Sequence, residues 1–144
     1  DSDIVPVIPK RCIRERKNGT WYKRIRTLFP GYILIRGKVT TEDYYILKTV
    51  PGILRILKGV NGLYRIDPEE IKVICRLMSD GELIGTSTAF QKGDSIVITE
   101  GPLFGLEGLI QSVDRRKGRV RVNISFLGDL RTVDLDIRFI TAST

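Results

Sequence analysis

The side chains that usually carry out catalysis or bind metals are few in this chain and far apart. The sequence contains no histidine, which is the commonest general base and metal ligand in proteins. Cys12 and Cys75 are widely separated and belong to no CxxC pair, so neither a zinc site nor a disulfide framework is predicted. Asp134 and Asp136 alternate with apolar residues, which predicts that both carboxylates lie on the outer, solvated face of a strand. We therefore expect no catalytic site, no metal site and no cofactor.

The glycine-rich segment at residues 101–108 is a second candidate for chemistry, because glycine-rich loops can hold phosphate groups. It lacks the Lys-Ser/Thr pair of a phosphate-binding loop, and no helical pattern follows it. Its glycines instead predict tight turns and close backbone approach. These observations indicate a binding protein rather than an enzyme.

Basic side chains are concentrated near the start of the chain. Residues 1–26 contain eight basic and three acidic side chains, within a chain whose net charge is +7. Asn18-Gly19 is typical of a type I′ turn, so residues 10–26 are predicted to form a hairpin. Arginine suits phosphate, and Trp21 and Tyr22 suit base stacking, which favours nucleic-acid binding over a merely solvated sheet edge. The predicted contacts are Lys10, Arg11, Arg14, Arg16, Lys23, Arg24 and Arg26.

A second basic cluster lies on a predicted tight turn in the other half of the chain. For this cluster, nucleic-acid contact and simple solvation are equally compatible with the pattern. Its members are Arg115, Arg116, Lys117 and Arg119.

Several segments of the first half have a recognisable secondary-structure pattern. Residues 31–36 are almost wholly apolar, which predicts a central strand covered on both faces. A helix is predicted to begin at residues 41–43 and to end near residues 50–52, and a strand is predicted at residues 53–58. A second helix is expected to begin at Asp67, with Pro68 in its first turn and Glu70 completing a capping box. Its apolar face is predicted to contain Ile71, Ile74, Cys75 and Met78.

The second half alternates apolar and polar residues, as half-buried strands do. Val120, Val122 and Ile124 are predicted to point inward from one strand, and Val133, Leu135 and Ile137 from the next. Residues 79–90 are small, polar and without periodicity, which predicts a linker. We therefore expect one domain at residues 1–78 and a second at residues 91–144.

Two sets of motifs carry a resemblance to a known family. The stretches at residues 93–98, 101–102, 108–110, 123–128 and 132–135 resemble the KOW domain of the NusG/Spt5 family of transcription elongation factors. Upstream, Leu28-Phe29-Pro30-Gly31-Tyr32-Ile33-Leu34-Ile35 is similar to the signature of the amino-terminal (NGN) domain of that family, and Val50-Pro51-Gly52-Ile53 fits the same domain.

The resemblance implies an α+β protein. Its first domain is expected to be an antiparallel α/β NGN-like sandwich, followed by a small SH3-like five-stranded β-barrel, the KOW domain. Relatives place a first strand and helix ahead of the Val5-Pro6 region, so the NGN-like domain is expected to be incomplete at its amino end.

The resemblance also implies partners. From the residues alone, Phe29 and Tyr32 would be core aromatics around a Pro-Gly turn. The NGN domain of the family binds the clamp helices of RNA polymerase around this motif, which assigns polymerase binding to Phe29, Tyr32 and Ile33. The KOW domain of general NusG proteins binds NusE or Rho through an apolar patch, and the matching positions are Leu103, Leu106 and Phe126.

Leucine at 103 and 106, where relatives often have phenylalanine, makes NusE and Rho less expected partners. That departure and the basic charge favour a specialised paralogue of the LoaP or RfaH kind, recruited by nascent RNA, such as a hairpin, or by non-template DNA. The expected function is processive transcription elongation or antitermination. The alternative is a KOW-containing ribosomal or RNA-binding protein that never contacts polymerase.

The expected location is the cytoplasm. Two lone cysteines are typical of a reducing compartment, and no apolar stretch approaches the roughly 20 residues of a membrane span. No membrane partner is therefore expected.

Overall fold

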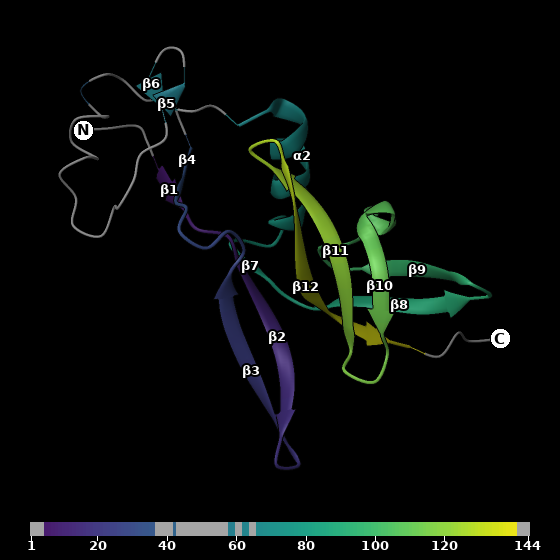
Figure 1. The fold of residues 1–144 in the computed structure, drawn as a ribbon. Helices are drawn as coiled ribbons and strands as arrows, with labels where there is room; N and C mark the ends of the chain where they lie inside the picture. The colour runs from purple at the N-terminus through teal and green to yellow at the C-terminus, as the bar shows by residue number, and fades with distance from the viewer. Residues whose placement is uncertain (1–4, 37–41, 43–57, 60–61, 64–65, 141–144) are drawn as a thin grey trace.

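A computed structural model describes residues 5–36, 42, 58–59, 62–63 and 66–140 of the chain (Figure 1). Within these residues the protein consists mostly of strands with a single multi-turn helix, α2 (Pro68–Leu77). No helix among the described residues is long and apolar enough to cross a membrane. The strands of the first part are β1 (Val5–Val7), β2 (Lys10–Lys17), β3 (Thr20–Thr27), β4 (Leu34–Arg36), β5 (Lys58–Gly59), β6 (Gly62–Leu63) and β7 (Leu83–Ile84). The later elements are β8 (Ser87–Lys92), β9 (Ser95–Glu100), the short 3-10 helix η1 (Glu107–Leu109), β10 (Ile110–Asp114), β11 (Arg119–Phe126) and β12 (Asp129–Phe139).

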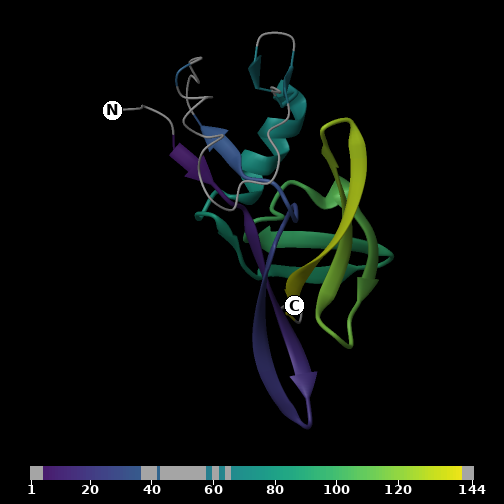
Figure 2. The same ribbon diagram turned by 60° about the vertical axis from the view of Figure 1, so that its left-hand side comes forward.

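Strands β2 and β3 form the predicted basic hairpin. Asn18 and Gly19 both have positive φ, 53° and 81°, as a type I′ turn requires. Strand β2 also pairs in parallel with β7, so the sheet order is β3-β2-β7 and β3 is an edge strand that is exposed along its whole length. The hairpin extends away from the other labelled elements in two views (Figures 1 and 2).

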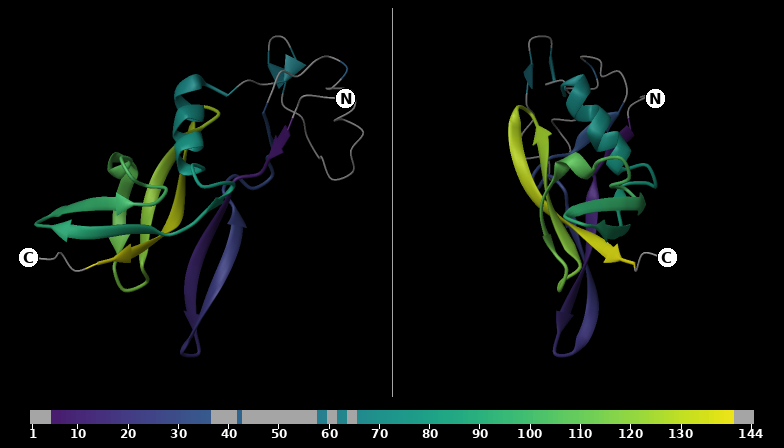
Figure 3. Two further views of the ribbon diagram at one scale, coloured as in Figure 1. Left: turned by 180° about the vertical axis from the view of Figure 1, so that it is seen from behind. Right: turned by 90° about the vertical axis from the view of Figure 1, so that its right-hand side faces the viewer.

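The second half forms a curled five-stranded sheet with the order β10-β11-β12-β8-β9. The predicted alternation is confirmed in β11, where Val120, Val122 and Ile124 are each 0% exposed. Strands β11 and β12 are joined by a tight turn at Leu127 and Gly128, whose φ angles are both positive at 54° and 84°. Helix α2 lies beside this β11–β12 hairpin (Figure 3).

Helix α2 begins as predicted, but its polar and apolar faces differ in part from the prediction. The Asp67 side chain accepts a hydrogen bond from the backbone N–H of Glu69 at 2.8 Å, which confirms the cap. The predicted capping box is wrong, because the Glu70 side chain turns away from the cap toward the β11–β12 turn. Ile74 is buried as predicted and Leu77 is buried with it, whereas Cys75, placed on the apolar face by the sequence pattern, is exposed.

The segment at residues 79–90, predicted to be a linker, takes part in sheet pairing. The segment contains β7 and the start of β8, and Ile84, Ser87 and Ala89 are at most 1% exposed. Both strands pair in parallel with distant partners, β7 with β2 and β8 with β12. Strand β7 has only two residues, and the first inward side chains of β8 are the small Ser87 and Ala89, so neither strand shows a hydrophobic alternation in the sequence.

The apolar run at residues 31–36 contains a strand shorter than predicted. Only Leu34–Arg36 are extended, as β4 paired with β1, and Ile33 is 45% exposed, so the expected cover on both faces is absent there. The helix predicted at residues 41–52 and the strand predicted at 53–58 lie outside the described residues, apart from Glu42 and Lys58.

Candidate interaction surfaces

The predicted polymerase-binding aromatics contact a predicted partner-binding aromatic of the other half of the chain. The rings of Phe29 and Phe126 are stacked, with centroids 4.0 Å apart and planes 6° from parallel. Tyr32 meets Phe126 edge-on at 5.2 Å, and the Arg131 guanidinium lies over both Tyr32 and Phe126. We call these four residues the aromatic junction. Phe29 is 2% exposed and Phe126 1%, so the two predicted surfaces cover each other.

Of the remaining residues of these two predicted surfaces, Leu103 and Leu106 are buried and Ile33 is exposed. Leu103 is 0% exposed and Leu106 8%, so both belong to the core. Their exposed neighbour is Phe104, at 58%. Ile33 lies on the surface at 45%, which makes it the predicted polymerase-binding residue most open to a partner.

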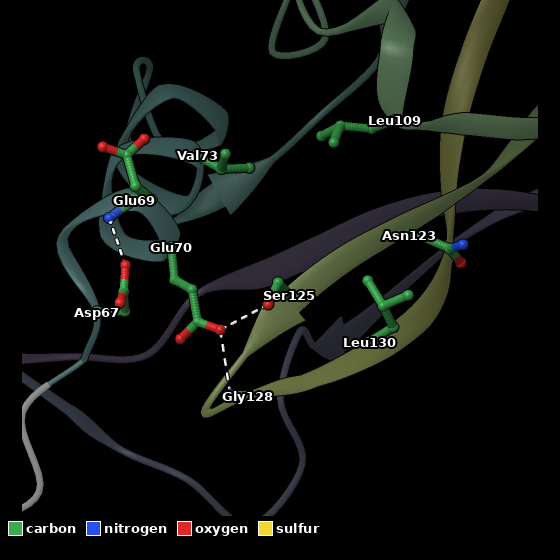
Figure 4. Close-up of a pocket in the computed structure, with 9 residues that line it drawn as sticks. All are labelled: Asp67, Glu69, Glu70, Val73, Leu109, Asn123, Ser125, Gly128 and Leu130. Carbon is green, nitrogen blue, oxygen red and sulfur yellow. Dashed lines mark hydrogen bonds between the residues drawn. The ribbon is translucent and has the colours of Figure 1, made fainter.

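A carboxylate links helix α2 to the β11–β12 turn next to the aromatic junction. Glu70 accepts hydrogen bonds from the Ser125 hydroxyl at 2.6 Å and from the backbone N–H groups of Leu127 at 2.9 Å and Gly128 at 3.1 Å. The Ser125 hydrogen bond is the largest cause of a lowered pKa for Glu70; burial opposes it, and the two amides lower it further. Figure 4 shows Glu70 pointing from the helix toward Ser125 and Gly128.

A pocket of about 560 Å³ lies between α2 and the β11–β12 hairpin at this point. Its helix side carries carboxylates and its sheet side is neutral, with Leu130 70% exposed. No lysine or arginine is among the residues that line it: Asp67, Glu69, Glu70, Val73, Leu109, Asn123, Ser125, Gly128 and Leu130 (Figure 4).

A second link joins the basic hairpin to β12. The Arg14 guanidinium lies 2.9 Å from a carboxylate oxygen of Asp136, which also accepts a hydrogen bond from the Thr86 hydroxyl at 2.5 Å. Asp136 is 1% exposed, so its predicted position on the solvated face is wrong. The alternation of β12 is overridden because β2 packs across this strand and covers its outer face.

Most of the predicted nucleic-acid contacts are already engaged within the chain. Arg11 donates to the backbone oxygen of Asp134 at 2.9 Å, and burial lowers the pKa of its guanidinium. The Lys10 ammonium nitrogen lies 3.5 Å from a carboxylate oxygen of Glu82, and the Arg24 Nε lies 2.9 Å from a carboxylate oxygen of Glu15. In contrast, the side chains of Arg16, Lys23 and Arg26 are exposed and make no ion pair or hydrogen bond with another residue of the described part.

The second basic cluster, within residues 115–119, also contains two side chains that bond within the chain and two that are exposed. Arg119 is only 17% exposed and donates to the Arg14 backbone oxygen, with Glu15 3.6 Å away. Arg115 is hydrogen bonded to Gln91 and lies over the Phe139 ring at 4.3 Å. Arg116 and Lys117 are exposed, so they are the members open to a phosphate.

Sequence reasoning missed Glu70, Thr86 and Arg131 as parts of these links. No local signal identifies the contacts that Glu70, Thr86 and Arg131 make with Gly128, Asp136 and Tyr32, because these partners are far away in sequence; Glu70 and Gly128, for example, are separated by 58 positions. Only the folded arrangement brings them together.

Comparison with known proteins assigns the chain to a family. Residues 2–75 match the family model described as transcription termination factor nusG, and residues 92–123 match the KOW motif. The transcription termination/antitermination protein NusG of Buchnera aphidicola subsp. Acyrthosiphon pisum is 30% identical over 134 residues, which cover 92% of this chain and 74% of that protein. The protein of the same name from Escherichia coli K12 is 26% identical over 132 residues, covering 90% and 73%.

The protein therefore belongs to the NusG/Spt5 family and is a transcription termination/antitermination factor of the NusG type.

Proposed function

We propose that the chain is a transcription elongation and antitermination factor that binds the clamp helices of RNA polymerase through Phe29, Tyr32 and Ile33. The proposal rests on family membership and on the NGN-like motif that contains these residues. An apolar helix-binding surface needs accessible anchors, and Ile33 already provides one. The proposed architecture is an NGN-like sandwich within residues 1–78, then an SH3-like barrel in the KOW region, whose sheet starts at Ser87.

The Phe29–Phe126 stack adds a condition to the proposal. It joins the surface proposed for polymerase to the surface proposed for a KOW partner, so neither is free in this arrangement. We call this arrangement the closed form. In our proposal the KOW sheet moves away from Phe29 before the clamp helices bind, and the same movement uncovers Phe126 for a second partner.

For the partner of the KOW domain we propose a choice of proteins and not a single one. NusE and Rho remain candidates for the KOW domain, with leucine instead of phenylalanine at 103 and 106 reducing the aromatic contact available to them. Specialisation of the LoaP or RfaH kind, and action in the cytoplasm, are part of the same proposal.

The hairpin is proposed as the nucleic-acid surface, with a narrower set of residues than the sequence indicated. Directly paired residues share a face of a hairpin, so the pairs Arg16–Trp21 and Arg14–Lys23 put Arg16, Trp21 and Lys23 on one side. Trp21 is 51% exposed and offers a ring for base stacking between two cations. Single-stranded DNA or RNA next to the polymerase is the proposed ligand, with Arg116 and Lys117 as further phosphate contacts; Arg26 lies on the opposite face of the hairpin and is outside this set.

Binding of purified RNA polymerase by an Ile33→Glu variant tests the clamp proposal. Ile33 is exposed, so the charge should leave folding intact and weaken binding by about 30-fold, the equivalent of a hot-spot loss of about 2 kcal/mol. Leu83→Glu is the matched control, because Leu83 is also 45% exposed and lies on β7. Equal binding by the two variants would remove Ile33 from the interface. Lack of binding by the parent chain would instead favour an RNA-binding protein that does not contact polymerase.

A further inference from the structure

The β11–β12 turn contains three hydrogen-bond donors that converge on one anion. Leu127 and Gly128 have consecutive positive φ angles, which aim their backbone N–H groups to the same side and form a concave anion-binding site. The Ser125 hydroxyl completes the set, and both oxygens of the Glu70 carboxylate accept from it. We call Ser125, Leu127 and Gly128 the carboxylate cradle.

The cradle belongs to the sheet and not to the helix that fills it. Its donors are held by the pairing of β11 with β12, which continues up to Phe126 opposite Asp129. Glu70 comes from α2 and contributes only its carboxylate. If the sheet moved away from the helix, the three donors would keep their geometry and face water without a partner. Unpaired donors that are already oriented bind an incoming anion with little ordering cost.

We propose that the carboxylate cradle is a docking site for an acidic side chain of a partner protein, and that Glu70 occupies it in the closed form. The adjoining surface carries Leu109 of η1 and the 70% exposed Leu130 of β12, so the partner segment has an apolar residue beside its acidic one. The inference rests on the opening of the closed form set out under the proposed function, but it concerns a partner of the KOW sheet and does not depend on polymerase binding.

The surroundings favour a carboxylate over a phosphate. Sites for phosphate groups usually gather arginine or lysine around the anion. The sheet side of the pocket contributes only neutral residues, and Asp129 follows the cradle directly in the chain. A polyanion such as nucleic acid would be repelled there, whereas neutral N–H and O–H donors suffice for a single carboxylate.

The test uses the full chain with Glu70→Ala, which vacates the cradle. The probe is the tripeptide acetyl-Leu-Glu-Leu-amide, and binding is followed by the NMR amide signals of Leu127 and Gly128. We expect the probe to shift both signals and to bind at least tenfold more tightly than acetyl-Leu-Gln-Leu-amide, because hydrogen bonds to a charged acceptor are stronger. Adding Ser125→Ala should weaken the response.

Matched controls decide the interpretation. Glu69→Ala removes a neighbouring carboxylate that is exposed and leaves Glu70 in the cradle, so this variant should not respond to the probe. Equal binding of the Glu and Gln tripeptides, or an equal response in the Glu69→Ala variant, would overturn the proposal. Tighter binding of inorganic phosphate or a single-stranded oligonucleotide at the same two amides would also overturn it.

Discussion

At the scale of the residue, the partner of a charged side chain decides what that side chain can do. Arg14 and Arg16 are both arginines on β2 and were equal candidates for phosphate contact. Arg14 neutralises Asp136, whose carboxylate is 1% exposed, whereas Arg16 extends into water. A buried carboxylate that loses its cation costs far more stability than an exposed cation does. Arg14 is therefore a structural residue in the closed form.

Replacing Arg14 by alanine should destabilise the protein. We expect a loss of about 2 kcal/mol in the free energy of unfolding, less than the roughly 3–5 kcal/mol of a fully buried pair, because the Arg14 side chain is 36% exposed. Arg16→Ala is the control and should change it by no more than about 0.5 kcal/mol. Urea unfolding measures both. Equal small effects in the two variants would show that Asp136 does not depend on Arg14.

The same scale shows where prediction from sequence succeeded and where it stopped. The Asp67 cap was predictable because a cap is satisfied within three residues of the helix start. Glu70 was assigned to the same local motif, yet a turn far along the chain offers it three donors instead of one. Competition between local and distant hydrogen bonds cannot be read from a local motif.

At the scale of the element, turns and long strands were predictable and short parallel pairings were not. The Asn18-Gly19 turn fixed the β2–β3 hairpin, and period-two alternation fixed β11. Strands β7 and β8 escaped detection because their pairing with β2 and β12 depends on tertiary contact. The segment predicted to be a linker therefore joins the two halves through sheet pairing, with β7 on β2 and β8 on β12.

The hairpin should bind single-stranded nucleic acid through one face. For a single strand, each phosphate that is neutralised contributes about −0.7 to the slope of the logarithm of the binding constant against the logarithm of the salt concentration. The double variant Arg16→Ala with Lys23→Ala should therefore reduce the magnitude of the slope by about 1.4. Binding should weaken similarly for all sequences. Fluorescence anisotropy with a labelled oligonucleotide at several salt concentrations measures this slope.

The control for the hairpin is Arg24→Ala. Arg24 lies on the opposite face and pairs with Glu15 at 2.9 Å, so its loss should leave the slope nearly unchanged. If the Arg24 variant loses as much slope as the double variant, the phosphates do not follow the Arg16–Lys23 face. If neither variant differs from the parent, the hairpin is a solvated edge.

At the scale of the whole molecule, the links between the two halves act together. The Phe29–Phe126 stack, the Glu70 hydrogen bonds and the Arg14–Asp136 pair each join residues of the first 78 positions to the KOW region. The stack covers Phe29 and Phe126, which are the proposed anchors for polymerase and for a KOW partner, and the other two links hold the two halves in this arrangement. In the proposed mechanism, the stability of the closed form therefore sets how often the proposed polymerase surface is available, since apparent affinity falls with the population of the binding-competent state.

Weakening one link should consequently strengthen polymerase binding. Glu70→Ala removes three hydrogen bonds between α2 and the sheet without touching Phe29, Tyr32 or Ile33, so the open form should become more populated. If that population rises tenfold, the apparent affinity for polymerase rises roughly tenfold as well. Glu69→Ala, one residue away and without a bond to the sheet among the described residues, should leave the affinity at the parent value. NMR signals of the Phe126 ring report opening in the same samples. Signals that show release of the ring together with an unchanged affinity would mean that polymerase does not bind the surface that Phe126 covers.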